Sequence, residues 1–124
     1  MKPEDKELLL KDLCARLPYG VKVKSYSERT VTLTLGNCDL ISMFYKDEDD
    51  WYCKPYLRPM SSMTEEEEKE YNLLANRCMC TTVGFIHLEA EPLLDWLNKN
   101  MFDYRDLISR GLAIKVTDDN NPYL

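Results

Sequence analysis

Hydrophobic residues near the start of the chain recur at the spacing of a helix. Between Pro3 and Leu17, the apolar positions follow the i, i+3, i+4, i+7 rule and are Leu10, Leu13, Cys14 and Leu17. Pro3 suits a first helical turn, whereas Pro18 and Gly20 are residues that end helices. We therefore expect a helix over Pro3–Leu17 that buries this face.

The middle of the chain changes to a period of two. Val21 and Val23 alternate with lysines, and Val31, Leu33 and Leu35 alternate with threonines, which is typical of half-buried strands. The pattern predicts four strands, at Val21–Lys24, Thr30–Leu35, Leu40–Tyr45 and Trp51–Leu57. Pro55 places the fourth near a sheet edge or a strand end. The charged run Lys46–Asp50 is expected to be a solvated loop.

The helical period returns after Thr64. Thr64 and Glu67 have the spacing of a capping box, in which each side chain satisfies an unpaired backbone N–H group at a helix start. The apolar stripe of the predicted helix is Tyr71, Leu74, Ala75 and Cys78. The following segment, Thr81–Leu88, fits a short strand with Val83, Phe85 and His87 on one face.

The last third predicts two helices and a strand. Pro92 is expected to open a helix that carries Leu93, Leu94, Trp96, Leu97 and Met101. Asp103 is expected to cap a short helix through Ile108, and Gly111 fits the position just after a helix end. A final strand would contain Leu112, Ile114 and Val116, and the polar tail beyond it is expected to fray.

This order of elements predicts an α+β fold in a single domain spanning residues 1–124. We expect an N-terminal helix, then an antiparallel sheet or a small, partly open barrel of four to five strands, then helices and a C-terminal strand.

Charge and composition narrow the function. The net charge is −6, which disfavours general binding to a phosphate backbone. No apolar run has the length of a membrane span, and the charged N-terminus does not resemble a signal peptide, so we expect a cytoplasmic protein. The five cysteines have irregular spacing, which favours reduced thiols.

Three residues are weak candidates for a metal site. Cys78, Cys80 and His87 are ligand types that zinc accepts, with Cys38 or Cys53 as a fourth. The usual paired Cys-x2-Cys knuckles are absent, however, and Cys78 falls on the apolar stripe, so we favour buried free thiols. A cysteine–histidine nucleophile has no further support, and the four glycines form no phosphate-binding loop. The sequence predicts no catalytic residue and no cofactor.

Aromatic residues cluster around the fourth predicted strand. Tyr52, Tyr56 and Arg58 are the residue types that anchor protein interfaces, and they are the predicted partner-binding residues. The same aromatic rings can instead close the end of a small core. A third interpretation joins Tyr52 and Tyr56 to Lys22, Lys24, Lys54 and Arg58 as a basic, aromatic strip for nucleic acid.

Several blocks of the sequence resemble one group of proteins. DLCARLPYGV at Asp12–Val21, KPYLRPMSSMTEEE at Lys54–Glu67, and DWLN, FDYRDLI and GLA between Asp95 and Ala113 are similar to small uncharacterised proteins of gut Bacteroidales and their phages or prophages. Several of those proteins have glycine in place of Asp106. The resemblance implies a mobile-element origin and a shared architecture, and it transfers no activity to any residue.

These observations favour a small, non-enzymatic accessory protein that binds another protein. Nucleic-acid binding through the β-rich segment is the first alternative, which the net charge disfavours. A small hydrolytic or metal-dependent enzyme is the second, which the missing motifs disfavour.

Overall fold

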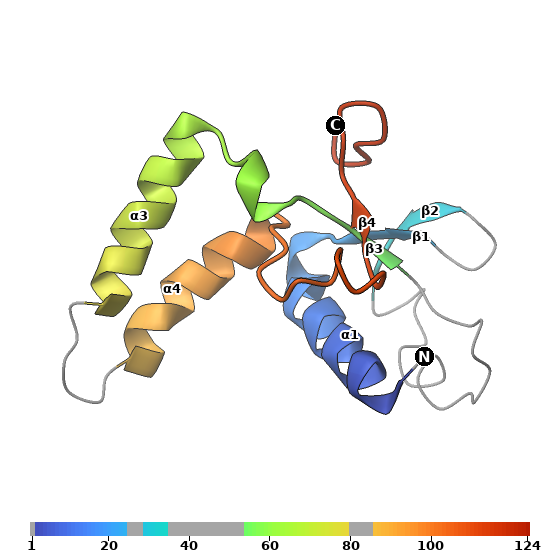
Figure 1. The fold of residues 1–124 in the computed structure, drawn as a ribbon, viewed down its shortest axis with the longest axis horizontal. Coiled ribbons are helices and arrows are strands. Elements are labelled where there is room, and N and C mark those ends of the chain that lie inside the picture. The colour runs from blue at the N-terminus through green and yellow to red at the C-terminus, as the bar shows by residue number, and fades with distance from the viewer. Residues whose placement is uncertain (1, 25–28, 35–53, 80–85) are drawn as a thin grey trace.

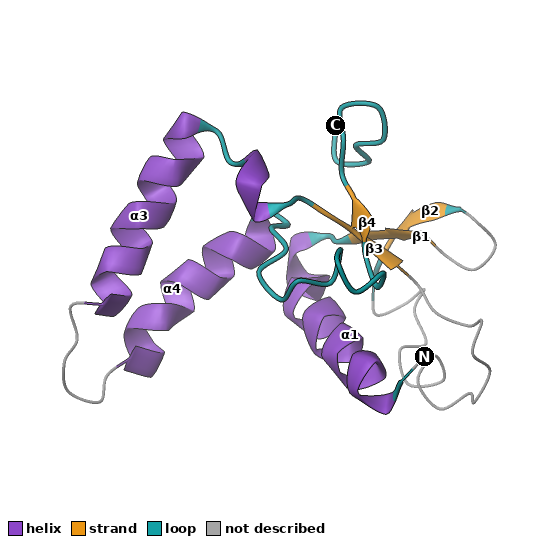
Figure 2. Ribbon diagram, in the orientation of Figure 1, coloured by secondary structure: helices purple, strands orange, loops and turns teal. Residues whose placement is uncertain are grey.

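The computed structural model describes residues 2–24, 29–34, 54–79 and 86–124, without the side chains of residues 78, 79 and 86–90. The fold is α+β, as predicted (Figures 1 and 2). Its elements are α1 (Pro3–Arg16), η1 (Leu17–Tyr19), β1 (Lys22–Lys24), β2 (Thr30–Thr32), β3 (Lys54–Leu57), η2 (Met60–Ser62), α3 (Glu65–Met79), α4 (Ile86–Lys99) and β4 (Ile114–Lys115). Three predicted strand regions, Leu40–Tyr45, residues 51–53 and residues 81–85, lie outside the described residues.

The described strands form one mixed sheet in the order β2-β1-β3-β4. β1 pairs antiparallel with β2 and with β3, whereas β3 pairs parallel with β4, with Tyr56 opposite Ile114. The parallel pair arises because the chain leaves β3, passes through both later helices and returns to the sheet edge from the same end. The described sheet is open and four-stranded, which agrees with the predicted four to five strands, and only the β3–β4 pair is parallel rather than antiparallel.

The two faces of the sheet differ in chemistry because strand residues alternate between them. Val23 faces Pro55 across the β1–β3 pair, and Val21, Val23 and Leu57 are fully buried against α1. The opposite face carries the lysines of β1 and β3 together with Tyr56. The core therefore lies between the sheet and α1, two elements that Figure 1 shows next to each other.

Helix α1 is rotated relative to the face predicted from its apolar residues. The buried residues are Leu9, Asp12, Leu13 and Arg16, whereas Cys14 is exposed. The prediction was wrong because it counted apolar positions only. Asp12 and Arg16 lie one turn apart and enter the interior as an ion pair, with Arg16 Nε 2.9 Å from Asp12 Oδ2.

Helices α3 and α4 form a hairpin that stands beside the sheet and α1 (Figure 1). The capping box is confirmed, because Thr64 Oγ1 accepts from Glu67 N at 3.2 Å and Glu67 Oε1 accepts from Thr64 N at 3.0 Å. Pro92 does not open α4, which begins at Ile86, so residues 86–88 are helical rather than extended. Helix α4 packs against α3, and this contact offsets part of the cost of the helical hydrogen bond that proline removes.

The chain between α4 and β4 contains turns where a short helix was predicted. Asp103 does cap this segment, since its carboxylate accepts from Leu107 N at 2.8 Å and from Ile108 N at 2.9 Å. Asp106, however, has φ of 63°, which a right-handed helix excludes. Gly111, with φ of 74°, has the left-handed conformation expected there.

The C-terminal tail is held to the sheet rather than frayed. The hydroxyl of Tyr123 donates to the carbonyl of Tyr56 at 2.7 Å and accepts from Lys22 N at 3.1 Å. One side chain therefore joins the tail to β1 and β3. Within the described ranges, no helix has the length and apolar character that crossing a membrane requires.

Candidate functional site

The predicted partner-binding residues occupy different environments. Tyr52 lies outside the described residues. Tyr56 is 8% exposed, and its hydroxyl lies 3.2 Å from Thr30 Oγ1 across the sheet. Tyr56 is thus buried on the face of the sheet opposite α1, so its ring exposes little surface to a partner.

Arg58 forms an ion pair with Glu67 of the same chain. Its Nη1 and Nη2 lie 2.9 Å and 2.7 Å from the two carboxylate oxygens of Glu67, and its guanidinium lies 4.2 Å from the centre of the Phe102 ring. These hydrogen bonds are the main reason why the pKa of Glu67 lies below its ordinary value. Arg58 therefore fixes the chain leaving β3 to the first turn of α3, and its charge is already matched.

The basic strip proposed for nucleic acid is only partly assembled. Lys24 and Lys54 face each other across the β1–β3 pair, and Lys22 lies on the same face of β1. Lys22 donates from Nζ to Thr32 at 2.7 Å, and all three lysines are half-buried. Because Tyr56 is buried and Arg58 is paired elsewhere, the strip offers no described aromatic ring for base stacking.

The weak metal candidates are placed only by their backbone. Cys78 belongs to α3 and His87 to α4, and their side chains lie outside the described set, as does the whole of Cys80. Among the described residues, no group of three or more cysteine, histidine or acidic side chains is arranged to hold a metal ion.

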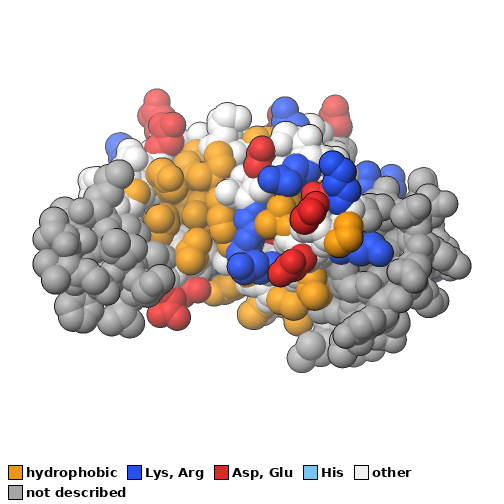
Figure 3. Space-filling model, turned by 60° about the horizontal axis from the view of Figure 1, so that its bottom comes forward, with side chains coloured by type: hydrophobic (Ala, Val, Ile, Leu, Met, Phe, Trp, Pro, Cys, Tyr) orange, Lys and Arg blue, Asp and Glu red, His pale blue; other side chains and the backbone are white. Residues whose placement is uncertain are grey.

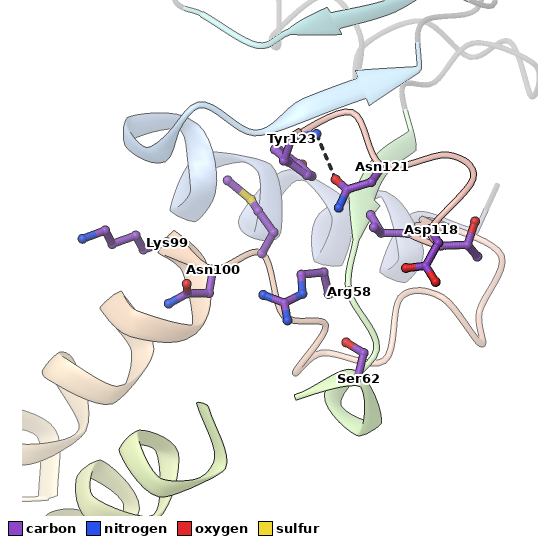
Figure 4. Close-up of a pocket in the computed structure, with 10 residues that line it drawn as sticks. Arg58, Ser62, Lys99, Asn100, Asp118, Asn121 and Tyr123 are labelled. Atoms are coloured by element: carbon purple, nitrogen blue, oxygen red, sulfur yellow. Dashed lines mark hydrogen bonds between the residues drawn. The ribbon is translucent and has the colours of Figure 1, made fainter. Parts of the chain in front are cut away.

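A polar pocket of about 380 Å³ lies between the end of α4 and the C-terminal tail (Figure 4). Its lining residues are Arg58, Ser62, Lys99, Asn100, Met101, Val116, Thr117, Asp118, Asn121 and Tyr123. Most of their polar groups already have partners in the same chain. Ser62 donates to Pro59 O, Asn100 donates to Trp96 O, and Asn121 accepts from Tyr123 N.

These internal hydrogen bonds limit what the polar pocket can bind. A ligand that bonds to Arg58, Ser62 or the donor groups of Asn100 would have to break a bond that the fold uses, which removes most of the gain. The two charged side chains without such a bond, Lys99 and Asp118, have opposite signs, so the pocket selects neither anions nor cations. The residues that line the polar pocket therefore contribute to the packing of the C-terminal tail.

A second cavity, the α3/α4 groove, has the opposite character. It has a volume of about 410 Å³ and is lined by Glu70, Leu73, Leu74, Arg77, Pro92 and Trp96. Leu73 is one of the apolar side chains that line the groove, and it is 68% exposed to solvent. Figure 3 shows hydrophobic side chains gathered over α3 and α4, on the left of that view.

The sequence of α3 explains why this surface has an apolar centre between two charged ends. Positions 70, 73, 74 and 77 follow the i, i+3, i+4, i+7 rule and share one face of the helix. A second stripe, containing Tyr71 and Ala75, is half-buried on the same helix. Leu74 belongs to both stripes, so α3 keeps apolar surface beyond the part that packs on α4.

Aromatic contacts hold the groove in a fixed shape. The ring of Trp96 lies 5.4 Å from that of Phe102 and 6.3 Å from that of Tyr71, measured between centroids. Trp96 Nε1 also donates to Glu70 Oε2 at 2.8 Å, which ties α4 to α3 across the groove. Since Phe102 in turn packs under Arg58, the groove is supported by the same ion pair that anchors the start of α3.

The groove residues were not among the predicted binding residues. The sequence placed Leu74 and Trp96 on apolar stripes and interpreted both stripes as core. Leu73 is the residue in the sequence that could have indicated the groove, because it lies one position away from the predicted stripe. It makes the apolar face of α3 wider than one neighbouring helix can cover. Comparison of the chain with protein-family models, with curated proteins and with solved structures finds no match.

Proposed function

We propose that this chain is a non-enzymatic interaction protein that binds another polypeptide through the α3/α4 groove. The observation that supports this proposal most directly is that Leu73 is 68% exposed beside the half-buried Leu74 and Trp96. Burying a leucine of this exposure removes apolar surface from water at about 25 cal/mol per Å². An amphipathic helix of the partner is the element that fits such a groove between two helices.

The rigidity of the groove supports this proposal. Trp96 is fixed by Phe102, Tyr71 and Glu70, so little side-chain freedom is lost when a partner docks. Trp is also among the residue types that carry most binding energy at interfaces. An accessory role agrees with the resemblance to proteins of mobile elements, which we propose as the origin of this chain.

The polar pocket gives less support to an enzymatic function. Its serine donates to a backbone carbonyl rather than to a base, with Ser62 Oγ 2.6 Å from Pro59 O. Its arginine is matched by Glu67. A catalytic site needs groups that are free to act on a substrate, and these two are engaged in the fold.

The test compares two lysine substitutions in the tagged chain, produced in the cells that encode it. Leu73→Lys places a charge in the groove, whereas Val31→Lys places the same charge on an exposed valine of β2 that is 37% exposed. We expect a polypeptide to copurify in stoichiometric amount with the wild type and with Val31→Lys, and to be lost with Leu73→Lys.

Equal recovery with all three chains would contradict the proposal, as would recovery of no polypeptide in stoichiometric amount with the wild type. Circular dichroism checks that both variants remain folded. Both substituted side chains are exposed, so we expect each to change stability by less than about 0.5 kcal/mol.

A further inference from the structure

We infer that the polypeptide bound in the α3/α4 groove is a second copy of this chain, with the two α3 helices antiparallel. This inference rests on the proposed function and names its partner. The charges at the two ends of the groove point to this partner.

The groove carries opposite charges at equal distances from its apolar centre. On α3, Glu70 lies one turn before the Leu73–Leu74 pair and Arg77 lies one turn after it, and both line the groove. Glu70 and Arg77 are separated by two turns, about 10 Å along the axis. The groove is therefore acidic at one end, apolar in the middle and basic at the other.

A two-fold axis through the centre of this pattern makes the surface complementary to itself. With the axis between Leu73 and Leu74, Leu73 of one copy faces Leu74 of the other, and Glu70 of each copy faces Arg77 of its mate. Two ion pairs then flank two symmetry-related leucine contacts. An unrelated partner would not require this symmetry in the groove, whereas a second copy does.

The acidic start of α3 also selects the antiparallel arrangement. Glu65, Glu66, Glu67 and Glu68 occupy the first turn. A parallel pair of α3 helices would bring the acids of both copies to the same end, where like charges repel. In the antiparallel pair these turns lie at opposite ends of the interface.

The product is a four-helix bundle made from two helical hairpins. Each copy contributes α3 and α4, and Leu73, Leu74, Pro92 and Trp96 of both copies form the central layer. Glu70 keeps one carboxylate oxygen for Trp96 Nε1 and offers the other to the second copy. The α3/α4 hairpin of each copy thereby covers the apolar stripe that the other copy alone would leave exposed.

A charge exchange in the full-length chain tests this pairing by sedimentation equilibrium. Arg77→Glu gives a chain with two acids on the groove, and Glu70→Arg gives a chain with two bases. Each variant alone would place like charges opposite each other at both ends. We expect each to dimerise about tenfold or more weakly than the wild type, which we expect to be dimeric in the micromolar range.

The mixture of the two variants is the decisive sample. A heterodimer of Arg77→Glu with Glu70→Arg restores both ion pairs, so the mixture is expected to dimerise about as strongly as the wild type. This rescue would not follow if Glu70 served only to hold Trp96. Lys69→Glu and Glu7→Arg are matched controls, since they make the same charge changes at exposed positions that do not line the groove.

The possible failures are distinguishable. A wild type that stays monomeric throughout the micromolar range overturns the inference, and so does a dimer whose affinity is unchanged by both reversals. If the chain is monomeric but Leu73→Lys still loses a stoichiometric partner protein, the proposed function stands with a different occupant. If it is monomeric and Leu73→Lys loses nothing, both fail.

Discussion

Arg58 and Glu67 form a two-pronged ion pair, with Nη1 2.9 Å from Oε2 and Nη2 2.7 Å from Oε1. Glu67 Oε1 also accepts from Thr64 N, so the carboxylate that caps α3 is the one that holds Arg58. The segment between them contains Pro59 and the short helix η2. The pair therefore closes this connection and sets the position at which α3 leaves the sheet.

We predict that Arg58→Lys lowers the free energy of unfolding by about 1 kcal/mol, because lysine keeps the charge but cannot bond both oxygens or lie flat on Phe102. Urea denaturation gives the change. Arg110→Lys is the control, since Arg110 is 52% exposed and lies 3.5 Å from Asp5, and we expect it to change stability by less than about 0.5 kcal/mol. Equal effects of the two substitutions would contradict the role assigned to Arg58.

Asp12 binds two arginines, of which Arg16 is fully buried and Arg105 is partly exposed. Its carboxylate lies 2.9 Å from Arg16 Nε and 2.9 Å from Arg105 Nη1, and both Asp12 and Arg16 are fully buried. We predict that Asp12→Asn lowers the free energy of unfolding by about 3–5 kcal/mol, because it leaves the buried arginine without a counter-charge. Asp5→Asn is the surface control, with an expected loss below about 1 kcal/mol.

A double substitution separates charge from packing at this site. Asp12→Leu combined with Arg16→Met replaces the buried pair with apolar side chains of similar size. We expect it to be closer in stability to the wild type than Asp12→Asn is, since an apolar pair avoids the desolvation of two ions. If Asp12→Asn were tolerated without loss, the ion pair would have no structural role.

Local signals in the sequence were sufficient for the parts of the fold that depend on neighbouring residues. Thr64 and Glu67 cap α3 through side chains three residues apart, and Gly111 adopts the left-handed conformation that its place after a helical pattern suggested. Both depend on backbone groups within a single turn. A sequence pattern contains all the information that such a motif needs.

Contacts between distant residues were not predictable in this way. The buried side of α1 is set by Arg105, which is 93 positions from Asp12, and the tail is fixed by Tyr123, which bonds Tyr56 over 67 positions. A periodicity pattern assigns a charged residue to the surface and a polar tail to solvent. It contains no information about contacts with residues that are distant in the sequence. The groove was missed for the same reason, since exposure of Leu73 depends on how much of α3 is covered by α4.

Asp106 adopts a conformation that favours glycine, with φ of 63°. Glycine is the residue that adopts such an angle without a steric penalty. We predict that Asp106→Gly raises the free energy of unfolding by about 0.5–1 kcal/mol, and that Asp106→Val lowers it by about 1–2 kcal/mol. Thermal or urea unfolding measures both.

Asp119→Gly is the matched control for the change at Asp106. Asp119 is also exposed, but its φ is not positive, so glycine there only adds freedom to the unfolded chain. We expect this substitution to lower the free energy of unfolding by up to about 1 kcal/mol. Changes of the same sign at both positions would contradict the assignment of strain to Asp106.

Tyr123 gives the chain a dependence on alkaline pH. Burial raises the pKa of its phenol from 10.0 to about 12, because the ionised ring would lie away from water between β1 and β3. A group whose folded-state pKa is raised contributes stability below its unfolded pKa and loses it as the pH rises through the folded value. We predict that this contribution, about 2–3 kcal/mol, is lost between pH 10 and pH 12.

Tyr123→Phe isolates this contribution from those of the other tyrosines and lysines. At neutral pH the variant loses the bonds to Tyr56 O and Lys22 N, so its free energy of unfolding should be about 1–3 kcal/mol lower than that of the wild type. Phenylalanine does not ionise, so the difference in stability should shrink as the pH rises above 10, the ordinary phenol pKa.

Tyr19→Phe, at a ring that is 37% exposed, controls for loss of a hydroxyl at neutral pH, with an expected change below about 0.5 kcal/mol. If wild type and Tyr123→Phe lose stability in parallel across this range, Tyr123 is not the group that titrates.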